Sequence, residues 1–378
     1  MTTIQNKALL PAGLRDALPD EAEREAMAVR DLMQAFRAEG YQTVKPPMLE
    51  FEDGLLAGPG GGLNAQLFRL MDPISQKMMG LRADITPQIA RIAATRLAQS
   101  PRPLRLCYSG QVLRVRGDQL RPERQFTQAG IELFGCDAVQ ADVEILLLMV
   151  TALNAAGVER LTVDLTVPSL APLVLAGRGL DKDRAAAARE ALDGKDAGEL
   201  RQIVGDDPVI FGLLEAVGSA GPALERLNAL NLSGQAGMMI ARLSETVAAI
   251  RAAEPGLSLT IDPGEYRGFE YQTGVAFTAF APGVRGEIGR GGRYVTETNE
   301  AAVGATVYLD SVLRALPDID GPTVLYVPFG TDVATTRHWR DQGYRVVCGL
   351  VAENDIAAEA HRLDCDAMLR DGAAVPVE

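Results

Sequence analysis

Apolar residues near the N-terminus recur at the spacing of one helical face. They fall at i, i+3, i+4 and i+7, which predicts a helix with one buried side, at Val29, Leu32, Met33 and Phe36. We expect Asp20 to cap this helix and Gly40 to end it. A second helix is predicted to start with Thr86 as its cap and to run to about Gln99, because Pro87 suits a first helical turn.

Alternating runs rich in strand-forming residues follow the second helix. They occupy 104–108, 111–116 and 125–134, and the polar loop between the last two predicts an antiparallel hairpin with a long tip. A helix is then expected at about 140–156. Four further strands are expected at 161–167, 257–261, 275–280 and 284–288. A helix is predicted to close this part of the chain at about 305–316.

These elements predict an α+β fold in which an antiparallel sheet is flanked by helices. Residues 168–254 are rich in alanine, leucine and charge, which predicts a helical insertion at about 168–255. The main domain that it interrupts is expected to span 1–320. From Gly321 the chain alternates strand and helix, so 321–378 is expected to form a small C-terminal α/β domain.

Charge and composition narrow the expected partners and location. The chain has 37 basic and 50 acidic residues, a net charge of −13, whereas nucleic-acid binding usually needs a basic surface. No nucleic-acid partner is predicted, although a local basic patch stays possible. The start lacks an export signal, and the most apolar stretch, 145–150, is too short to span a bilayer. With no C-x-x-C pair and only two histidines, we expect a cytoplasmic, reduced protein with no metal and no cofactor.

Two pairs of polar residues indicate a ligand pocket. Asp84 precedes Thr86 at a predicted helix start, where the pair can receive an ammonium group; the alternative is a helix cap with a solvated aspartate. Gln128 and Glu132 lie on one strand face, because residues of equal parity point the same way. Arg114 and Arg116 are expected to share a face of the neighbouring strand. A solvated sheet face remains the alternative for these strands.

Two glycine-rich segments add little by themselves. Residues 58–62, GPGGG, lack the Lys-Ser/Thr of a phosphate-binding loop and are expected to form a mobile loop. Residues 289–294, GRGGRY, are compatible with a tight hairpin.

Taken together, four segments resemble the catalytic domain of histidyl-tRNA synthetase, a class II aminoacyl-tRNA synthetase, over roughly residues 10–316. LRADIT at 81–86 resembles that family's L-R-P-E-x-T, and RQFTQAGIELFG at 124–135 resembles R-Q-F-x-Q-x-G-x-E-x-x-G. RGFEYQTG at 267–274 resembles R-G-x-D-Y-Y-T-G, and GGRYV at 291–295 resembles G-G-R-Y-D. The second and third motifs belong to histidine recognition within the class.

The resemblance implies a histidine site of seven residues: Asp84, Thr86, Arg114, Gln128, Glu132, Arg267 and Tyr271. Asp84, Thr86 and Gln128 match positions that hold the α-amino group. Glu132 and Tyr271 match positions that bind the imidazole, and Arg267 matches the arginine on the carboxylate side. Asp84 replaces a longer glutamate, and Gln272 replaces the second tyrosine of the third motif, so the identity of the ligand stays open at this point.

The residues that hold ATP in class II synthetases are missing. The family's R-x-E is here Arg114-Val115-Arg116, with an arginine at the position whose glutamate contacts adenine. Its G-L-E-R is here Tyr308-Leu309-Asp310-Ser311, so the arginine that stabilises the triphosphate is absent. Losing one such donor can cost about 3 kcal/mol of transition-state stabilisation. We therefore expect no catalytic residues and no amino-acid activation.

A synthetase-like chain that holds histidine without activating it is similar to one known family, the regulatory subunits of ATP phosphoribosyltransferase. This resemblance implies a role in the first step of histidine biosynthesis and in its feedback inhibition, with L-histidine as effector. It also implies a short-form catalytic subunit as partner, typically in a hetero-octamer, and self-association as a dimer. The 58 residues of 321–378 are short for an anticodon-binding domain, which favours the same interpretation.

Two other functions stay open on the sequence alone. One is a histidyl-tRNA synthetase with altered ATP contacts. The other is a synthetase paralogue that binds RNA or protein in another pathway, for which the acidic charge predicts no tRNA gel shift at moderate salt.

Overall fold

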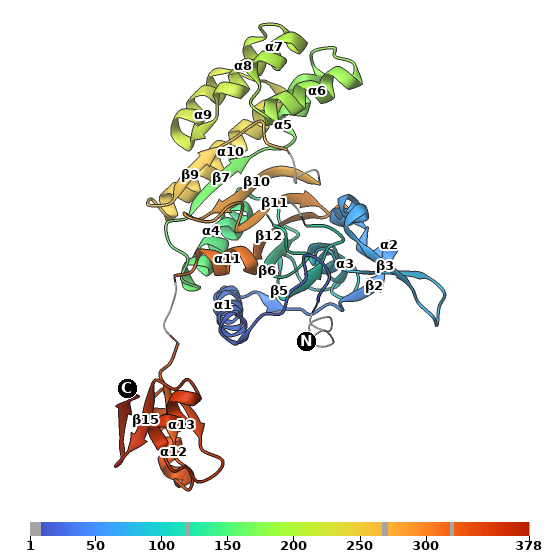
Figure 1. The fold of residues 1–378 in the computed structure, drawn as a ribbon. Coiled ribbons are helices and arrows are strands. Elements are labelled where there is room, and N and C mark those ends of the chain that lie inside the picture. The colour runs from blue at the N-terminus through green and yellow to red at the C-terminus, as the bar shows by residue number, and fades with distance from the viewer. Residues whose placement is uncertain (1–8, 118–120, 267–270, 318–320, 378) are drawn as a thin grey trace. The chain divides into compact units, whose positions relative to one another are not determined.

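The computed structural model describes residues 9–117, 121–266, 271–317 and 321–377. The chain divides into two compact units, Met1–Pro317 and Asp318–Glu378. Figure 1 labels many of the elements of both. None of the helices in the described ranges is long and apolar enough to cross a membrane.

A nine-stranded sheet forms the centre of the first unit, with the order β1-β5-β6-β12-β11-β10-β7-β9-β8. All neighbouring strands are antiparallel except β1 with β5 and β7 with β9. In spatial order the strands are Gln42–Thr43, Leu104–Leu113, Gln125–Phe134, Ala301–Tyr308, Gly289–Val295, Gln272–Phe280, Thr162–Thr166, Ser258–Ile261 and Gly218–Ser219. The predicted α+β class with a mainly antiparallel sheet is confirmed.

Helices α1 (Pro19–Ala38), α4 (Val139–Ala155) and α11 (Leu309–Ala315) pack against one face of this sheet. The alternation of β6 explains why: Ala129, Ile131 and Leu133 face the core shared with α1 and α4. The residues between them face the other side. There α3 (Thr86–Ala94) covers a second, smaller apolar cluster that includes Ile85 and Ile89, and a 3₁₀ helix, η2 (Gly58–Gln66), packs against α3.

A second sheet lies beside η2 in the order β2-β4-β3, and all its strands are antiparallel. Its strands are Leu49–Phe51, Met78–Leu81 and Phe68–Met71, and the short helix α2 (Glu52–Leu55) follows β2. Leu55, Leu67 and Ala83 form the apolar cluster beneath it. This sheet leads the chain directly into α3.

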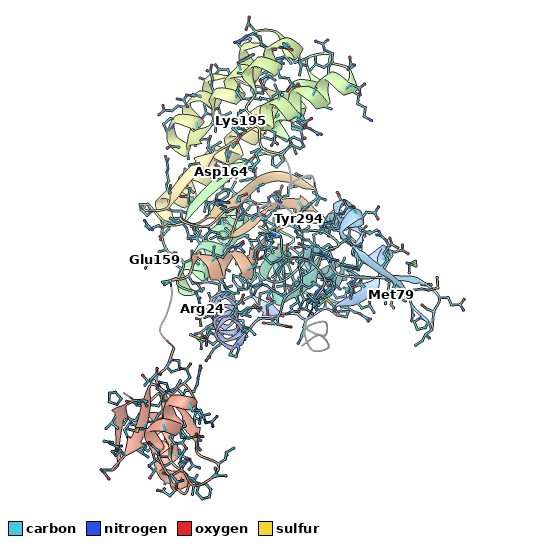
Figure 2. The ribbon with its side chains drawn as sticks, in the orientation of Figure 1. Arg24, Met79, Glu159, Asp164, Lys195 and Tyr294 are labelled. Carbon is cyan, nitrogen blue, oxygen red and sulfur yellow. The ribbon has the colours of Figure 1, made fainter. Side chains whose placement is uncertain are left out.

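Six helices lie between β7 and β9. They are α5 Leu170–Ala176, α6 Lys182–Asp193, α7 Ala197–Val204, α8 Pro208–Glu215, α9 Ala220–Ala229 and α10 Gly234–Ala253. The side chains of Asp181, Asp196 and Asp207 accept backbone N–H bonds at the starts of α6, α7 and α8, which fixes where these helices begin. Lys195, labelled in Figure 2, pairs with Asp262 just after β9 at 2.7 Å and ties this insertion to the sheet.

The second unit is a four-stranded sheet in the order β14-β13-β15-β16. Its elements are β13 Val324–Val327, α12 Val333–Asp341, β14 Arg345–Cys348, α13 Ile356–Arg362, β15 Ala367–Arg370 and β16 Ala373–Pro376. The first three strands are parallel, as β/α alternation predicts. The antiparallel strand β16 was not predicted.

Several predicted elements were wrong. The runs at 104–108 and 111–116 form one strand, β5, which ends at Leu113, so the arginines after it do not share a strand face. Residues 284–288 precede β11, and the helix expected at 305–316 begins at Leu309, after the unpredicted strand β12. Both β11 and β12 contain glycine and small residues that weaken a strand signal.

Three local predictions also failed. GPGGG begins the helix η2 and is not a loop without structure. Asp20 lies in the first turn of α1 without capping it, because the N-cap position is Leu18. Thr86 is the first residue of α3; its own N–H is capped by the carboxylate of Asp84. Gly40, with a φ of +82°, follows α1 as predicted, since glycine adopts this conformation without steric cost.

Candidate functional site

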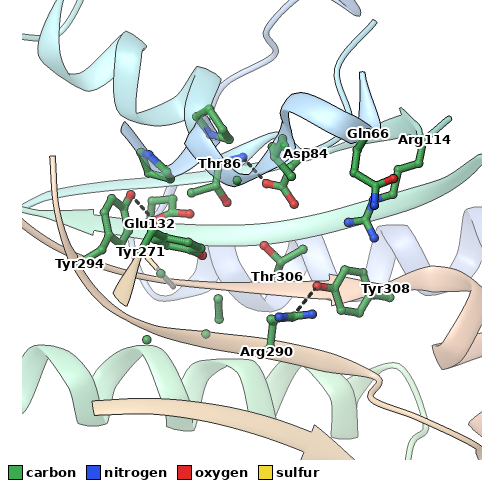
Figure 3. A pocket seen from close by; sticks show the side chains of 18 residues that line it. Gln66, Asp84, Thr86, Arg114, Glu132, Tyr271, Arg290, Tyr294, Thr306 and Tyr308 are labelled. Carbon is green, nitrogen blue, oxygen red and sulfur yellow. Dashed lines mark hydrogen bonds between the residues drawn. The ribbon is translucent and has the colours of Figure 1, made fainter. Parts of the chain in front are cut away.

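A polar cavity of about 250 Å³ opens on the face of the large sheet that α3 and η2 cover. Its walls come from η2, the start of α3, β6, β11 and β12, and the residue before β10. Figure 3 shows Glu132, Tyr271 and Tyr294 together at one end and Gln66, Arg114, Arg290 and Tyr308 at the other. Asp84 and Thr86 lie between the two groups. Five of the seven predicted site residues line this cavity.

The middle of the cavity carries a carboxylate held by the start of α3. Asp84 Oδ1 accepts the N–H of Thr86 at 2.9 Å, and Asp84 Oδ2 accepts a bond from Gln128 Nε2 at 2.8 Å. Gln128 is fully buried, and its Oε1 accepts the N–H of Ile85 at 3.2 Å. Gln128 therefore orients Asp84 from behind, and the oriented carboxylate is suited to receive an ammonium group.

A chain of hydroxyl groups extends across the floor of the cavity. Tyr108, fully buried on β5, has its hydroxyl 3.2 Å from that of Thr86 and 2.8 Å from that of Thr306 on β12. These contacts join α3 to the central strands. They also fix Thr86 against the sheet, so that the carboxylate beside it keeps its position.

Glu132 carries a buried carboxyl group at the other end. It is 1% exposed, and burial raises its pKa to about 8, although the hydrogen bond from the Tyr294 hydroxyl, 2.8 Å from Oε2, favours the ionised form. Tyr271 stands edge-on to Tyr294, with ring centroids 5.7 Å apart. At neutral pH the carboxyl group is mostly protonated, so it both donates and accepts hydrogen bonds. This end is therefore suited to an imidazole.

Close approach of β12 to β6 makes room for this carboxyl group. Gly304 pairs with Glu132 across the two strands, and a Cβ at that position would overlap the Glu132 carboxylate. Because Glu132 is buried and bonded to Tyr294, it cannot turn away into solvent. Glycine is therefore needed at position 304 both for the close approach of the two strands and for the position of the Glu132 carboxyl group in the cavity.

We expect Gly304→Ala to lower the free energy of unfolding by about 1–3 kcal/mol, the usual range for overpacking. The added methyl group displaces Glu132 from Tyr294, so histidine binding should weaken in the same variant. Denaturant unfolding measures the first effect. Gly256→Ala is the matched control, because its Cβ would meet nothing within 4 Å; equal losses in both variants would contradict the explanation.

The opposite end of the cavity is cationic. Arg114 follows β5, donates from Nε to the carbonyl of Ala83 at 3.3 Å, and lies 5.0 Å from the centroid of the Phe126 ring. Arg290, on β11, donates from Nε to the hydroxyl of Tyr308 at 3.0 Å and from Nη2 to Glu287 Oε1 at 2.9 Å. Both guanidinium groups are thus held in place by neighbouring groups.

Two residues from the motifs, Arg116 and Ser311, do not line this cavity. Arg267 lies outside the described residues. Arg116 is exposed, unlike Arg114, so the two do not share the predicted face. Ser311 is buried in the first turn of α11, where its hydroxyl accepts a bond from Arg314 at 3.0 Å. Among the described residues no cluster of His, Cys, Asp and Glu side chains is placed to hold a metal ion.

Sequence reasoning did not assign several polar residues to the cavity, among them Gln66, Arg290, Tyr294, Thr306 and Tyr308. Arg290 and Tyr294 belong to the GRGGRY segment, which we took for a possible hairpin turn. The segment is a central strand, paired with β10 on one side and β12 on the other. That pairing brings both side chains to the cavity, and no local signal in the sequence could have shown it.

Relatives identify the family to which this site belongs. Residues 13–312 match the profile of the histidyl-tRNA synthetase family. The chain is 51% identical to the ATP phosphoribosyltransferase regulatory subunit of Rhodospirillum centenum, over 95% of this chain and 93% of that protein. It is 50% identical to that of Paramagnetospirillum magneticum, over the full length of both. The chain belongs to the family of ATP phosphoribosyltransferase regulatory subunits.

Solved structures agree on the fold. An ATP phosphoribosyltransferase regulatory subunit/histidyl-tRNA synthetase from Bacillus halodurans matches with a TM-score of 0.80 at 24% identity, covering 93% of this chain and 96% of that one. Histidyl-tRNA synthetase from Nostoc matches with a TM-score of 0.78 at 18% identity, covering 97% and 91%. The class II synthetase fold predicted from the four motifs is confirmed, and so is membership of the regulatory-subunit family.

Proposed function

We propose that this chain is a non-catalytic subunit that confers histidine sensitivity on ATP phosphoribosyltransferase. The observation that carries the proposal is the pairing, in one cavity, of the oriented carboxylate of Asp84 with the buried carboxyl group of Glu132. The names of the relatives support a partnership with the catalytic subunit of that enzyme. We place the assembly at the first step of histidine biosynthesis, in the cytoplasm, as a hetero-octamer built on dimers of this chain.

The cavity suits each part of histidine. Asp84 offers a carboxylate to the α-ammonium group, and Arg114 offers a guanidinium to the α-carboxylate. At the far end, Glu132 and Tyr271 supply hydrogen-bonding groups to the imidazole nitrogens. Glu132 is buried, and a buried polar group without a hydrogen-bond partner is unfavourable. Its position therefore favours a ligand that can form hydrogen bonds with the carboxyl group. We assign these roles, with Thr86 and Gln128 positioning Asp84, as part of the proposal.

Feedback inhibition follows if histidine binds more tightly to an inactive arrangement of the complex than to an active one. The ligand shifts the equilibrium only by its differential affinity for the two arrangements. The synthetase-like chain then acts as a sensor, and the reaction takes place on the catalytic partner.

Two positions that hold ATP in synthetases carry other residues here, and neither lies among the described residues of the cavity wall. Arg116, at the family's glutamate position, is exposed, and Ser311, at its arginine position, is buried and bonded to Arg314. Tyr308 stands where the family motif has glycine; it is 3% exposed and held under the guanidinium of Arg121, 3.8 Å from its ring centroid. An anchored aromatic side chain at that position leaves little room for a nucleotide.

The test combines histidine-dependent ATP–pyrophosphate exchange with calorimetric titration of histidine on the purified chain. We expect no exchange above background together with saturable histidine binding. Reconstitution with a short-form catalytic subunit should then yield transferase activity that histidine inhibits. Robust exchange would overturn the non-catalytic assignment, and inhibition by histidine without any contribution from this chain would overturn the sensor role.

A further inference from the structure

Four large apolar side chains are exposed together at one edge of the second unit. Strands β13 and β14 pair in parallel, so their carboxyl ends lie at the same edge of the sheet. Phe329 follows β13, Val333 begins α12 (Figure 1), and Leu350 and Val351 follow β14. Their exposed fractions are 55%, 70%, 87% and 70% in that order. Exposed apolar side chains that gather in one place indicate a binding surface, whereas single ones do not.

The two loops that carry these side chains lie against each other. The N–H of Phe329 donates to Glu353 Oε2 at 3.4 Å, and the hydroxyl of Tyr326 donates to the other oxygen of the same carboxylate. A Cβ at Gly349 would come within 2.8 Å of the backbone nitrogen of Phe329, so the loop after β14 approaches the loop after β13 closely. The four side chains therefore form one surface, the apolar edge: Phe329, Val333, Leu350 and Val351.

The second unit builds its own core without the apolar edge. One apolar cluster contains Leu325 and Val327, and the other contains Tyr326 and Met368. Among residues 321–377 neither cluster includes a side chain of the apolar edge. These four side chains are thus apolar surface that folding of the unit leaves in water, and a partner that covered them would gain by removing it from water.

Carboxylates flank the apolar edge. The two loops contain three acids, Asp332, Glu353 and Asp355, and neither lysine nor arginine; the first arginine after them on α12 is Arg337. Asp332 caps α12 and Asp355 caps α13. A hydrogen bond from the Thr335 hydroxyl holds the pKa of Asp332 below its usual range, so this carboxylate is ionised at neutral pH.

This charge narrows the choice of occupant. The whole chain has a net charge of −13, so a second copy would on average bring like charge to the carboxylates. A segment with apolar side chains between lysines or arginines matches both the apolar edge and the acids around it. The relatives are named as regulatory subunits of ATP phosphoribosyltransferase, so the catalytic subunit is the partner that the proposed function supplies.

We infer that the apolar edge of the second unit docks a segment of the catalytic subunit whose apolar side chains are flanked by basic residues. The apolar side chains of that segment cover Leu350 and Val351 and their neighbours, and its basic residues pair with Asp332 and Asp355. The inference rests on the proposed function, because it assumes the catalytic partner. It gives 321–378 a role in assembly that is distinct from histidine binding in the first unit.

The double substitution Leu350→Ser with Val351→Ser tests the apolar contribution. Calorimetric titration of the full chain with a short-form catalytic subunit gives the dissociation constant. We expect at least about tenfold weaker binding, because two large apolar side chains no longer leave water on assembly. Met238→Ser on α10 is the matched control, since Met238 is 67% exposed and lies in the first unit; it should bind as the wild-type protein does.

The double substitution Asp332→Asn with Asp355→Asn tests the charge. Asparagine caps a helix as well as aspartate does, so α12 and α13 keep their starts while two charges are lost. Binding should weaken by about fivefold at low salt and should depend less on salt than in the wild-type protein. Thermal melting checks that every variant is folded. An unchanged salt dependence would overturn the basic flanks of the docked segment.

Histidine titration of the same variants separates the inference from the function on which it rests. Both double variants should bind histidine as the wild-type protein does, because the cavity lies in the first unit. Unchanged affinity for the catalytic subunit in both variants would overturn the docking role and leave histidine sensing intact. A wild-type chain that does not bind the catalytic subunit would overturn the proposed function and this inference with it.

Two further measurements detect a different occupant. If Leu350→Ser with Val351→Ser lowers the sedimentation coefficient of the free chain, a second copy covers the apolar edge. If the wild-type chain shifts tRNA in a gel and this variant does not, the edge binds RNA. Either result would overturn docking of the catalytic subunit; we expect neither.

Discussion

Replacing Glu132 with alanine is expected to abolish inhibition of the assembled transferase by histidine. The substitution removes the buried carboxyl group from the imidazole end of the cavity and leaves the hydroxyl of Tyr294 without its acceptor. Leaving a buried polar group without its partner costs about 1–3 kcal/mol, and the substitution deprives both Tyr294 and the imidazole of one, so histidine affinity should fall by about 100-fold. Enzyme assays over a histidine titration, with the catalytic subunit present, measure the effect.

Assembly should survive in this variant. Glu132 is 1% exposed and faces the cavity, so it offers no surface to a partner. Size-exclusion chromatography with the catalytic subunit checks this point, and Glu245→Ala, at an exposed position of α10, is the matched control. Unchanged inhibition by histidine in Glu132→Ala would remove Glu132 from the site and with it the assignment of the imidazole end.

Histidine binding is expected to be strongest between about pH 6.5 and about pH 8. Burial raises the pKa of Glu132 to about 8, and a free imidazole has a pKa of about 6.5. Between these values Glu132 is protonated and the ligand ring is neutral. The carboxyl group and the imidazole then share this one proton in the complex, and binding neither takes up a proton from solvent nor releases one. Affinity is then independent of pH in this window.

The sign of the change differs on the two sides. Above about pH 8 Glu132 is ionised before binding, so the complex must take up a proton, and affinity falls by about tenfold per pH unit. Below about pH 6.5 both groups are protonated, the complex must release a proton, and affinity falls again as the pH decreases. Calorimetry in buffers of different ionisation enthalpy counts these protons directly.

Glu132→Gln provides the control for this profile. The amide keeps the size and hydrogen-bonding capacity of the protonated acid but does not ionise. The decrease in histidine affinity above about pH 8 should disappear in this variant. Any decrease in affinity caused by deprotonation of the ligand's α-ammonium group should be the same in both proteins. If histidine affinity depends on pH above about pH 8 in the same way in the wild-type protein and in Glu132→Gln, Glu132 does not bind the imidazole.

The local sequence was sufficient for much of the fold. Helical spacing located α1, and the shared parity of Gln128 and Glu132 placed both side chains on one buried face of β6. The composition of 168–254 indicated a helical segment, and helices α5–α10 occupy it. These features depend on contacts between residues close in the chain, for which periodicity is a direct signal.

Elements defined by distant partners were beyond the reach of local patterns. The second half of strand β12 (Ala301–Tyr308) was predicted as the start of a helix. Its extended form depends on pairing with β6 and β11. Gly304 belongs there because of the Glu132 carboxylate on the neighbouring strand. Strand propensity reflects such neighbours more than the residue itself.

The amino-acid sequence alone therefore determined the family, the class of fold and two residues at one end of the cavity, Glu132 and Tyr271. Only the tertiary structure decided that Gln128 positions Asp84, that Arg116 points away while Arg290 enters, and that Gln66 joins the site from η2. The physical reason is that burial and charge at each position depend on strands far apart in the chain. The raised pKa of Glu132, caused by burial among such strands, is one consequence.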